Sequence, residues 1–228
     1  MSKQAFAVSA AIVLAAACSA THATTYNAAA DFSTSNNPNG VWSFGGQTSL
    51  GGAFTAFSVN GTTSGFDFWH YGAYGYLGYL GAIHNGTGSA INWGTVVLDP
   101  GQLALHPGAG AGDYSLARFT APTAGMYTFS ANFIGQDYII GTTTDVHLLV
   151  NNVSVFDGLV NGFLATASSG TFAMNLAAGD TIDAAVGFQA GSFYGDTTGL
   201  DFNVELVPAP GPIALALLAI APRRRRRS

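Results

Sequence analysis

The chain has 228 residues, 48% of them hydrophobic and only 8% charged, with 30 glycines and one cysteine, which indicates a single folded domain with additional segments. The 16 Phe, 9 Tyr and 3 Trp residues suffice for a sizeable core, so a disordered chain, a coiled coil and a collagen-like repeat are excluded. Between Lys3 and Arg223, 12 acidic residues face a single cation, Arg118, and the resulting formal charge of −11 argues against nucleic acid or anionic lipid as a partner.

The N-terminus is typical of an export signal. Lys3 supplies a positive start, Ala5 to Ala17 form an apolar stretch, and Thr21-His22-Ala23 is a small-x-small cleavage site. The apolar stretch is too short to span a bilayer, which needs about 20 residues. We therefore predict a signal peptide over residues 1–23, removed by signal peptidase. A helical segment of the core is the alternative.

The only cysteine lies within this predicted signal. Cleavage after Ala23 or Ala20 removes Cys18 and leaves a mature protein with neither thiol nor disulfide. The run Ala15-Ala16-Ala17-Cys18 also has a weak likeness to a lipid-attachment site, which stays open as a second way of processing this end.

The segment from Phe66 to Tyr79 interleaves seven aromatic residues with glycine. Flat rings stack on the apolar faces of sugars, and Tyr and Trp edges form hydrogen bonds, so this segment is a candidate platform for a glycan. The alternative, which we favour, is that the rings fill the core or cover a sheet edge. The glycan-binding candidates are Trp69, Tyr71, Tyr74, Tyr76 and Tyr79.

Catalytic motifs are not found in the mature region. It has no Gly-x-Ser-x-Gly elbow, metalloprotease helix, phosphate loop or cysteine nucleophile. The glycine-rich run from Gly108 to Gly112 indicates a flexible turn, because no helical pattern follows it. Four histidines lack the short spacing of metal ligands, so we expect each on a polar face or satisfied in the core. They are His70, His84, His106 and His147. The sequence therefore predicts no catalytic residue and no enzyme.

Apolar residues alternate with polar ones over most of the second half of the body. Tyr127, Phe129, Ala131 and Phe133 lie on one face of a predicted strand, as in a half-buried sheet. The same period recurs at residues 146–150, 172–176, 182–188 and 200–206. Asn151-Asn152 suits the positive φ angles of a two-residue hairpin turn leading to Val153 and Val155. We predict that residues 24–206 form one all-β domain, a jelly-roll-like antiparallel β-sandwich.

Two charged features of this body point to specific partners. Arg118 begins a predicted strand among neutral residues, so we expect it to form a structural ion pair with a carboxylate. Asp196 and Asp201 lie near Gly195 and Gly199, and carboxylates in such loops are candidate ligands for calcium. The alternative, that they are solvated turn aspartates, is the one we favour, so no cofactor is predicted.

Several segments of the body are also similar to the body domain of many PEP-CTERM proteins. They include Leu105-His106-Pro107-Gly108, Arg118-Phe119-Thr120-Ala121-Pro122 and Ala178-Gly179-Asp180-Thr181-Ile182, and the likeness covers roughly residues 100–205. It implies a β-sandwich outwardly like carbohydrate-binding modules, with no assigned activity.

The C-terminal segment, residues 207–228, has three parts. A proline-rich element from Val207 to Gly211 is followed by an apolar run from Ile213 to Ala221 and by the arginines 223–227. Pro212 suits the first turn of a helix, and the Ala, Leu and Ile residues after it favour one. A helix of about 16 residues is about 24 Å long, a marginal span for a hydrocarbon core of about 30 Å. The arginines favour the cytoplasmic side, which leaves the body outside.

This tail resembles the PEP-CTERM sorting signal of Gram-negative bacteria, which combines a Pro-x-Pro element, a short hydrophobic helix and terminal arginines. Ala209 stands where the motif that names the family has Glu. The resemblance implies recognition by an exosortase, a membrane enzyme that cleaves near the prolines; retention as a stop-transfer anchor is the alternative. The sorting-motif residues are Pro208, Pro210, Gly211, Arg223, Arg224, Arg225, Arg226 and Arg227.

These features together predict an exported, non-catalytic protein of the cell surface or extracellular matrix. It would pass through an inner-membrane intermediate and, by way of its aromatic residues, bind exopolysaccharide. Two alternatives stay open. One is a secreted glycan hydrolase or lyase, which needs two carboxylates across a groove, and the other is a purely structural coat protein.

Overall fold

In the computed structural model, which describes residues 23–71, 81–189 and 192–209, the described chain consists of β-strands and connecting loops without any helix. The predicted all-β class is therefore confirmed. Within these residues no helix has the length and hydropathy to cross a membrane. The predicted signal peptide, apart from Ala23, and the predicted tail helix lie outside the described residues.

The first of two large sheets, sheet A, is built around a long antiparallel pair. Strand β11 (Gly125–Gly135) pairs with β17 (Thr198–Val207) over ten residues. The seven shorter strands of sheet A are β1 (Thr24–Asn27), β4 (Val59–Thr63), β5 (Phe66–His70), β6 (Gly81–His84), β9 (Leu103–His106), β14 (Thr166–Ser168) and β15 (Phe172–Leu176). All of its described pairings are antiparallel.

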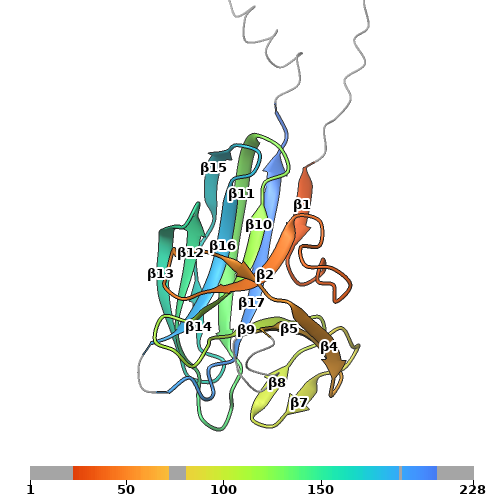
Figure 1. Ribbon diagram of the computed structural model, residues 1–228, viewed down its shortest axis with the longest axis vertical. Coiled ribbons are helices and arrows are strands. Elements are labelled where there is room, and N and C mark those ends of the chain that lie inside the picture. Colours follow the sequence, from red (N-terminus) through yellow and green to blue (C-terminus); the bar gives the residue numbers. More distant parts are fainter. Residues whose placement is uncertain (1–22, 72–80, 190–191, 210–228) are drawn as a thin grey trace, which may run out of the picture. The chain divides into compact units, whose positions relative to one another are not determined.

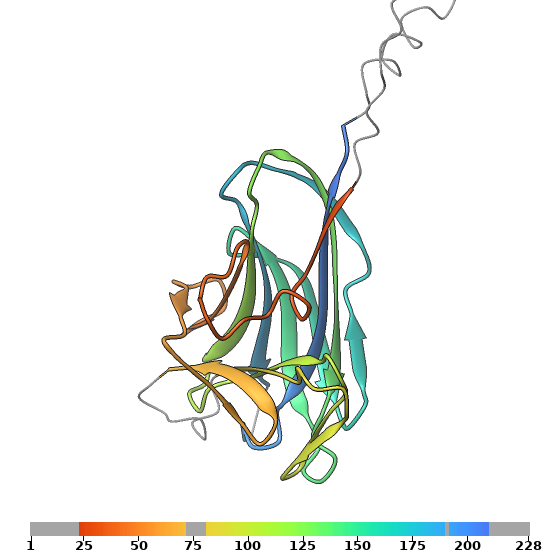
Figure 2. The ribbon, with the colours of Figure 1, turned by 90° about the vertical axis from the view of Figure 1, so that its right-hand side faces the viewer.

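Sheet B has six strands in the order β13-β12-β16-β10-β2-β3. They are β2 (Trp42–Gln47), β3 (Thr55–Ala56), β10 (Tyr114–Thr120), β12 (Thr143–Val150), β13 (Val153–Asn161) and β16 (Thr181–Phe188). From β10 onward the chain passes repeatedly between sheets A and B, as it does in a jelly roll. The predicted antiparallel, jelly-roll-like β-sandwich is confirmed (Figure 1), and the view turned by 90° in Figure 2 shows the two sheets as layers.

The core between the sheets contains the residues that alternation predicted to face inward. In β11, Tyr127, Phe129, Ala131 and Phe133 are at most 2% exposed, and they join one hydrophobic cluster with residues of β12, β16 and β17. The predicted hairpin turn is also confirmed, because Asn151 and Asn152 have φ angles of 50° and 66°.

The outer face of sheet B differs from a simple half-buried sheet. Six consecutive residues of β16 are buried, not every second one. The reason is a second apolar cluster on that face, in which Leu116, Leu149 and Ala185 are covered by Leu50 and Phe54 of the β2–β3 connection. Alternation within a strand cannot predict burial by a distant loop.

The antiparallel register divides the domain into two ends. Because β11 and β17 run in opposite directions, the β11–β12, β13–β14 and β16–β17 loops meet at one end, which we call the loop pole. Thr24 pairs with Leu206 at the opposite end, the terminal pole, where the domain begins and ends. The hairpin of β7 (Ile91–Trp93) and β8 (Val96–Leu98) belongs to the loop pole, since Val96 bridges to Asp137. The loop pole is at the bottom of Figures 1 and 2.

Candidate functional site

A cavity of about 210 Å³ opens at the loop pole, and we call it the end pocket. The β7–β8 hairpin, the end of β9, the β11–β12 loop and the β16–β17 loop supply its walls. Its lining residues are Trp93, Gly94, Thr95, Val96, His106, Asp137, Gly195 and Thr197. The lining therefore combines the indole ring of Trp93, the imidazole of His106, the carboxylate of Asp137 and the hydroxyls of Thr95 and Thr197. This combination suits a small polar ligand with apolar faces.

Asp137 fixes the shape of this pocket. Its carboxylate is 1% exposed, and Oδ1 accepts hydrogen bonds from the backbone N–H of Ile139 at 3.0 Å and of Ile140 at 2.7 Å. Its Oδ2 accepts from the hydroxyl of Thr95. One buried side chain thus joins the β11–β12 loop to the β7–β8 hairpin, so the pocket is held in place before any ligand arrives.

The aromatic walls of the end pocket are packed from behind. The ring of Trp93 meets that of Phe66 with centroids 5.0 Å apart and an angle of 60° between their planes. His106 lies at the end of β9, with its Nδ1 2.9 Å from the carbonyl oxygen of Pro107. Because a carbonyl only accepts, Nδ1 carries a proton and donates to it.

Exposed apolar side chains surround the pocket, and we call this set the rim. Tyr138 is attached to the pocket wall, since its N–H donates to the carbonyl of Thr95 at 2.9 Å and its hydroxyl to that of Gly94 at 3.3 Å. Its ring lies 6.1 Å from that of Phe163. The rim residues, between 42% and 65% exposed, are Tyr138, Ile139, Ile140, Phe163, Leu164 and Tyr194.

Further contacts connect the rim residues to the pocket wall and to neighbouring parts of the chain. Ile140 packs so closely on Gly195 that a Cβ there would lie 2.8 Å from the Cβ of Ile140. Tyr194 precedes Gly195 and stacks on Phe193 with centroids 4.5 Å apart. The N–H of Leu164 donates to the carbonyl of Gly135, the last residue of β11, at 2.9 Å. Exposed apolar side chains gathered in this way are typical of an interaction surface.

Asp196, beside the end pocket, is an unusual carboxyl. Its Oδ1 accepts hydrogen bonds from the N–H of Thr143 at 2.7 Å and from its hydroxyl at 3.1 Å. Its Oδ2 is buried without a partner. Burial raises the pKa of Asp196 to about 6; the hydrogen bonds from Thr143 oppose this, and the charges of Asp137 and Asp145 add to it. This carboxyl therefore changes protonation near neutral pH.

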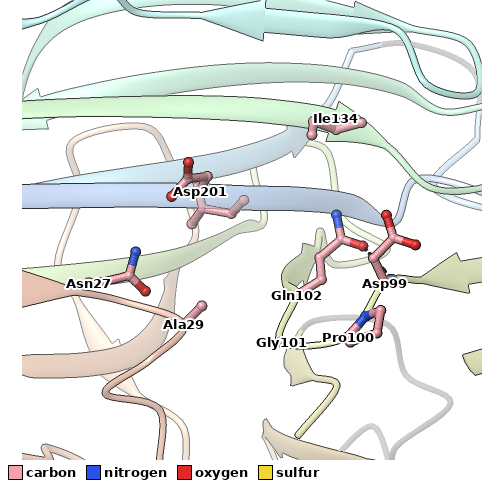
Figure 3. Close-up of a pocket in the computed structure, with 9 residues that line it drawn as sticks. Asn27, Ala29, Asp99, Pro100, Gly101, Gln102, Ile134 and Asp201 are labelled. Atoms are coloured by element: carbon pink, nitrogen blue, oxygen red, sulfur yellow. Dashed lines mark hydrogen bonds between the residues drawn. The ribbon is translucent and has the colours of Figure 1, made fainter. Parts of the chain in front are cut away.

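A second cavity, of about 240 Å³, lies on sheet A, and we call it the side pocket (Figure 3). Figure 3 shows Asn27 and Asp201 on one side and Gln102 and Asp99 on the other. Two of its polar groups have partners within the fold, since Asn203 donates to Oδ1 of Asp201 at 2.7 Å and Gln102 Oε1 accepts from the N–H of Asp99 at 2.9 Å. None of the described residues that line it is aromatic, so the end pocket is the better candidate.

The predicted glycan platform is not gathered at either pocket in the described residues. Trp69 is 5% exposed and belongs to the core, where its Nε1 donates to the carbonyl of Ser33 at 2.6 Å. Tyr71 is partly buried and donates to the carbonyl of Thr55 at 2.8 Å. Both rings therefore lie where the favoured alternative placed them, in the core or packed against it. Tyr74, Tyr76 and Tyr79 lie outside the described residues.

The two calcium candidates are not brought together. Asp196 contacts Thr143 of sheet B, whereas Asp201 lines the side pocket on sheet A. Across residues 23–71, 81–189 and 192–209, no three His, Cys, Asp or Glu side chains are grouped so as to hold a metal ion. Calcium binding by this pair, which we did not favour, is untested. Asp196 is fully buried and is therefore not the solvated turn aspartate that we expected.

Arg118 has the predicted carboxylate partner. Its Nε and Nη2 each donate to a different oxygen of Asp183 at 2.7 Å, and the side chain of Asp183 is fully buried. The guanidinium also lies 4.2 Å above the ring of Phe54. The predicted structural ion pair is therefore confirmed, and it lies on the outer face of sheet B.

His147 of β12 lies between two carboxylates on the same face. Its Nε2 is 3.0 Å from Asp145 Oδ2, and its Nδ1 is 2.6 Å from Asp157 Oδ1. Burial lowers the pKa of His147, but the hydrogen bonds and charges of Asp145 and Asp157 outweigh burial and raise the pKa above its usual value. Tyr114 donates to the same oxygen of Asp145 at 2.7 Å. Both ring nitrogens of the histidine have hydrogen-bond partners, as predicted for a satisfied histidine.

The sorting motif is only partly within the described chain. Pro208 and Ala209 follow the end of β17, while Pro210, Gly211 and the arginines 223–227 lie outside the described residues.

Sequence reasoning named His106 and Gly195 for other reasons, but it did not assign any residue to the end pocket or its rim. A local signal existed at the rim, because Tyr138-Ile139-Ile140 and Phe163-Leu164 are apolar residues in turns, where alternation had already ended. The pocket itself has no local signal, since residues 93–96, 106, 137 and 195–197 meet only in the folded chain.

Neither a protein-family model nor a curated protein matches the chain. Among solved structures, it is similar to CBM51 from Clostridium perfringens GH95, described in complex with methyl-galactose, with a TM-score of 0.37, 13% identity, and coverage of 66% of this chain and 94% of that one. It is also similar to a family 35 carbohydrate binding module from Clostridium thermocellum, with a TM-score of 0.32, 12% identity, and coverage of 81% and 98%.

A third similar structure is the catalytic domain of GH87 alpha-1,3-glucanase, with a TM-score of 0.28, 13% identity, and coverage of 48% of this chain and 22% of that one. All three TM-scores are below 0.5. The fold assignment therefore rests on the strand pairing of this chain.

Proposed function

We propose that this domain is a non-catalytic carbohydrate-binding protein of the cell surface, and that the end pocket and its rim bind extracellular polysaccharide. The observation that carries the proposal is the exposure of Tyr138, Phe163 and Tyr194 beside a pocket lined by Trp93, polar groups and a buried carboxylate. Aromatic faces bind the C–H faces of sugar rings, and hydroxyl and carbonyl groups bind their hydroxyls.

The state of the nearby carboxylates favours binding over hydrolysis. A glycosidase needs two carboxyl groups that flank the scissile bond at about 5–9.5 Å from each other. Asp137 uses both oxygens in hydrogen bonds that hold the loop, and Asp196 is fully buried. Asp145 and Asp157 are both bound to His147. A polysaccharide-acting enzyme is the alternative, and the first experiment separates the two.

The test compares the double variant Tyr138→Ala/Tyr194→Ala with the parent protein in affinity gels that contain polysaccharide from the native host. We expect retention to fall at least about fivefold, because two stacking contacts of about 0.5–1.5 kcal/mol each are lost. Stability should change little, since both rings are about half exposed. The matched control is Leu159→Ala, which removes a 54% exposed apolar side chain from β13.

Three outcomes would contradict this assignment. Equal retention of parent and double variant places the binding elsewhere. Release of reducing ends by the parent protein identifies an enzyme. A parent protein that is neither retained nor active on any fraction is a structural coat protein.

We further propose that the C-terminal segment, residues 207–228, sorts the exported domain to the cell surface through an exosortase. The supporting features are the Pro-x-Pro element, the apolar run and the arginines. An epitope placed after Ser228 should be absent from the mature surface protein in a host that has an exosortase, and should remain when the exosortase gene is deleted. An epitope that stays in both hosts indicates an anchor, and one that is open to external protease refutes the topology.

A further inference from the structure

We infer that the end pocket and rim take an uncharged glycan that carries acetyl groups. The inference rests on the proposed function and adds the chemical class of the ligand. Two independent properties of the site lead to it: the charge that surrounds the site, and the aliphatic part of the rim.

The charge of the domain selects against acidic glycans. In residues 23–71, 81–189 and 192–209, 12 carboxylates face one guanidinium, that of Arg118. That guanidinium is already bound to both oxygens of Asp183. Asp137 lines the pocket and Asp196 is its neighbour, so a uronate or sulfate would enter a field dominated by carboxylates. An uncharged glycan meets no such electrostatic penalty.

The aliphatic side chains of the rim expose more apolar surface than an unsubstituted sugar can bury. Ile139, Ile140 and Leu164 are 65%, 58% and 61% exposed. A sugar ring covered with hydroxyls offers these branched side chains little apolar surface, whereas the methyl of an acetyl group can be buried against them. Burying one methyl strengthens binding by about fourfold, which corresponds to about 0.8 kcal/mol.

The backbone fixes these aliphatic side chains in their exposed positions. The N–H groups of Ile139 and Ile140 both donate to the buried carboxylate of Asp137. Leu164 has a φ of 57°, a left-handed conformation that is uncommon for leucine, and its N–H is bonded to Gly135. A site held in this way loses little conformational entropy when it binds a ligand.

A lipid surface is the competing occupant for exposed isoleucine and leucine. Anionic lipid is disfavoured by the same excess of carboxylates. Acyl chains would also leave the hydroxyls and the carboxylate of the end pocket facing hydrocarbon, which is costly. The polar pocket at the centre of the rim therefore favours a glycan, and vesicles of phosphatidylcholine serve as a separate arm of the test.

The experiment measures binding of the whole protein to three oligosaccharide preparations by titration calorimetry. They are naturally acetylated glucomannan fragments, the same fragments after alkaline deacetylation, and alginate fragments of similar length. We expect the acetylated fragments to bind at least about fourfold more tightly than the deacetylated ones. Alginate should show no binding at low salt.

Variants test whether the rim is responsible. Ile139→Ser/Leu164→Ser should reduce the preference for acetylated fragments to within about twofold, while Leu159→Ser on β13 should leave it unchanged. The Tyr138→Ala/Tyr194→Ala variant should bind the acetylated and the deacetylated fragments more weakly by a similar factor.

The outcomes separate this inference from the proposed function. Equal affinity for acetylated and deacetylated fragments, or binding of alginate, overturns the inference and leaves glycan binding intact. Failure to bind any of the three or any host polysaccharide overturns both. Stable association with phosphatidylcholine vesicles that the Ile139→Ser/Leu164→Ser variant loses assigns the rim to a membrane, and so overturns the inference.

Discussion

The variant Arg118→Ala is expected to lower the free energy of unfolding by about 3–5 kcal/mol, the largest effect we predict for a single substitution. Arg118 neutralises Asp183 through two hydrogen bonds of 2.7 Å, and Asp183 has no exposed side-chain surface. Removal of the guanidinium leaves a buried charge without its partner. The variant also loses the contact between Arg118 and the ring of Phe54, which covers the outer face of sheet B.

Urea unfolding at pH 7 measures this effect, and a double variant distinguishes its cause. Arg118→Met/Asp183→Leu removes both charges and retains apolar volume, so its free energy of unfolding should lie well above that of Arg118→Ala. If the double variant is as unstable as the single one, the loss comes from packing. A change below about 1 kcal/mol for Arg118→Ala would show that the pair is solvated like a surface salt bridge.

The second large effect that we expect is a decrease in the free energy of unfolding as the pH rises through about 6. The pKa of Asp196 is about 6 in the folded protein, against about 3.9 for an unperturbed aspartate. A carboxyl whose pKa is raised by folding stabilises the folded state fully below the unfolded value, and that contribution disappears as the pH passes the folded value. From pH 4 to pH 7.5, Asp196 should therefore remove on the order of 2 kcal/mol from the free energy of unfolding.

The substitution Asp196→Asn isolates this contribution. The amide retains an oxygen that accepts from Thr143, but it does not titrate. The raised pKa of His147 also makes stability fall with rising pH, above about 6.5, so the informative quantity is the difference between the parent and variant curves. We expect the free energy of unfolding of the variant to increase relative to that of the parent as the pH rises from 4 to 7.5. A constant difference over that range would show that Asp196 is ionised throughout.

The strands that could be predicted are those whose own residues decide which side is buried. In β11 the core receives Tyr127, Phe129 and Phe133, and polar or exposed residues fill the alternate positions, so the period of two is clear. The hairpin at Asn151-Asn152 was predictable for an equally local reason, because these residues tolerate positive φ angles.

The first half of the domain gave no such signal, for physical reasons. All six residues of β2 are buried, so it has no alternation, and β3 has only two residues. Strand β4 alternates only between partly buried and exposed positions. Such strands owe their place to pairing with distant partners, such as Trp42 of β2 with Phe119 of β10.

The end pocket illustrates the same limit for function. The sequence directed attention to the aromatic residues between Phe66 and Tyr79, yet Trp69 is used in the core. The exposed rings come instead from loops that are joined by long-range contacts, such as that between Tyr138 and Phe163. Alternation locates strands, but ring exposure depends on which loops meet at a pole.

The antiparallel register of β1 and β17 has a consequence for how the protein would work when tethered. Both ends of the domain leave from the terminal pole, and β17 extends from Val207 to Thr198, about 30 Å, before it reaches the loops around Thr197. If the C-terminal segment fastens the domain, as we propose, the loop pole lies at the far end of β17 from Val207, where that segment begins. The proposed binding site would then be separated from the attached end by the length of β17.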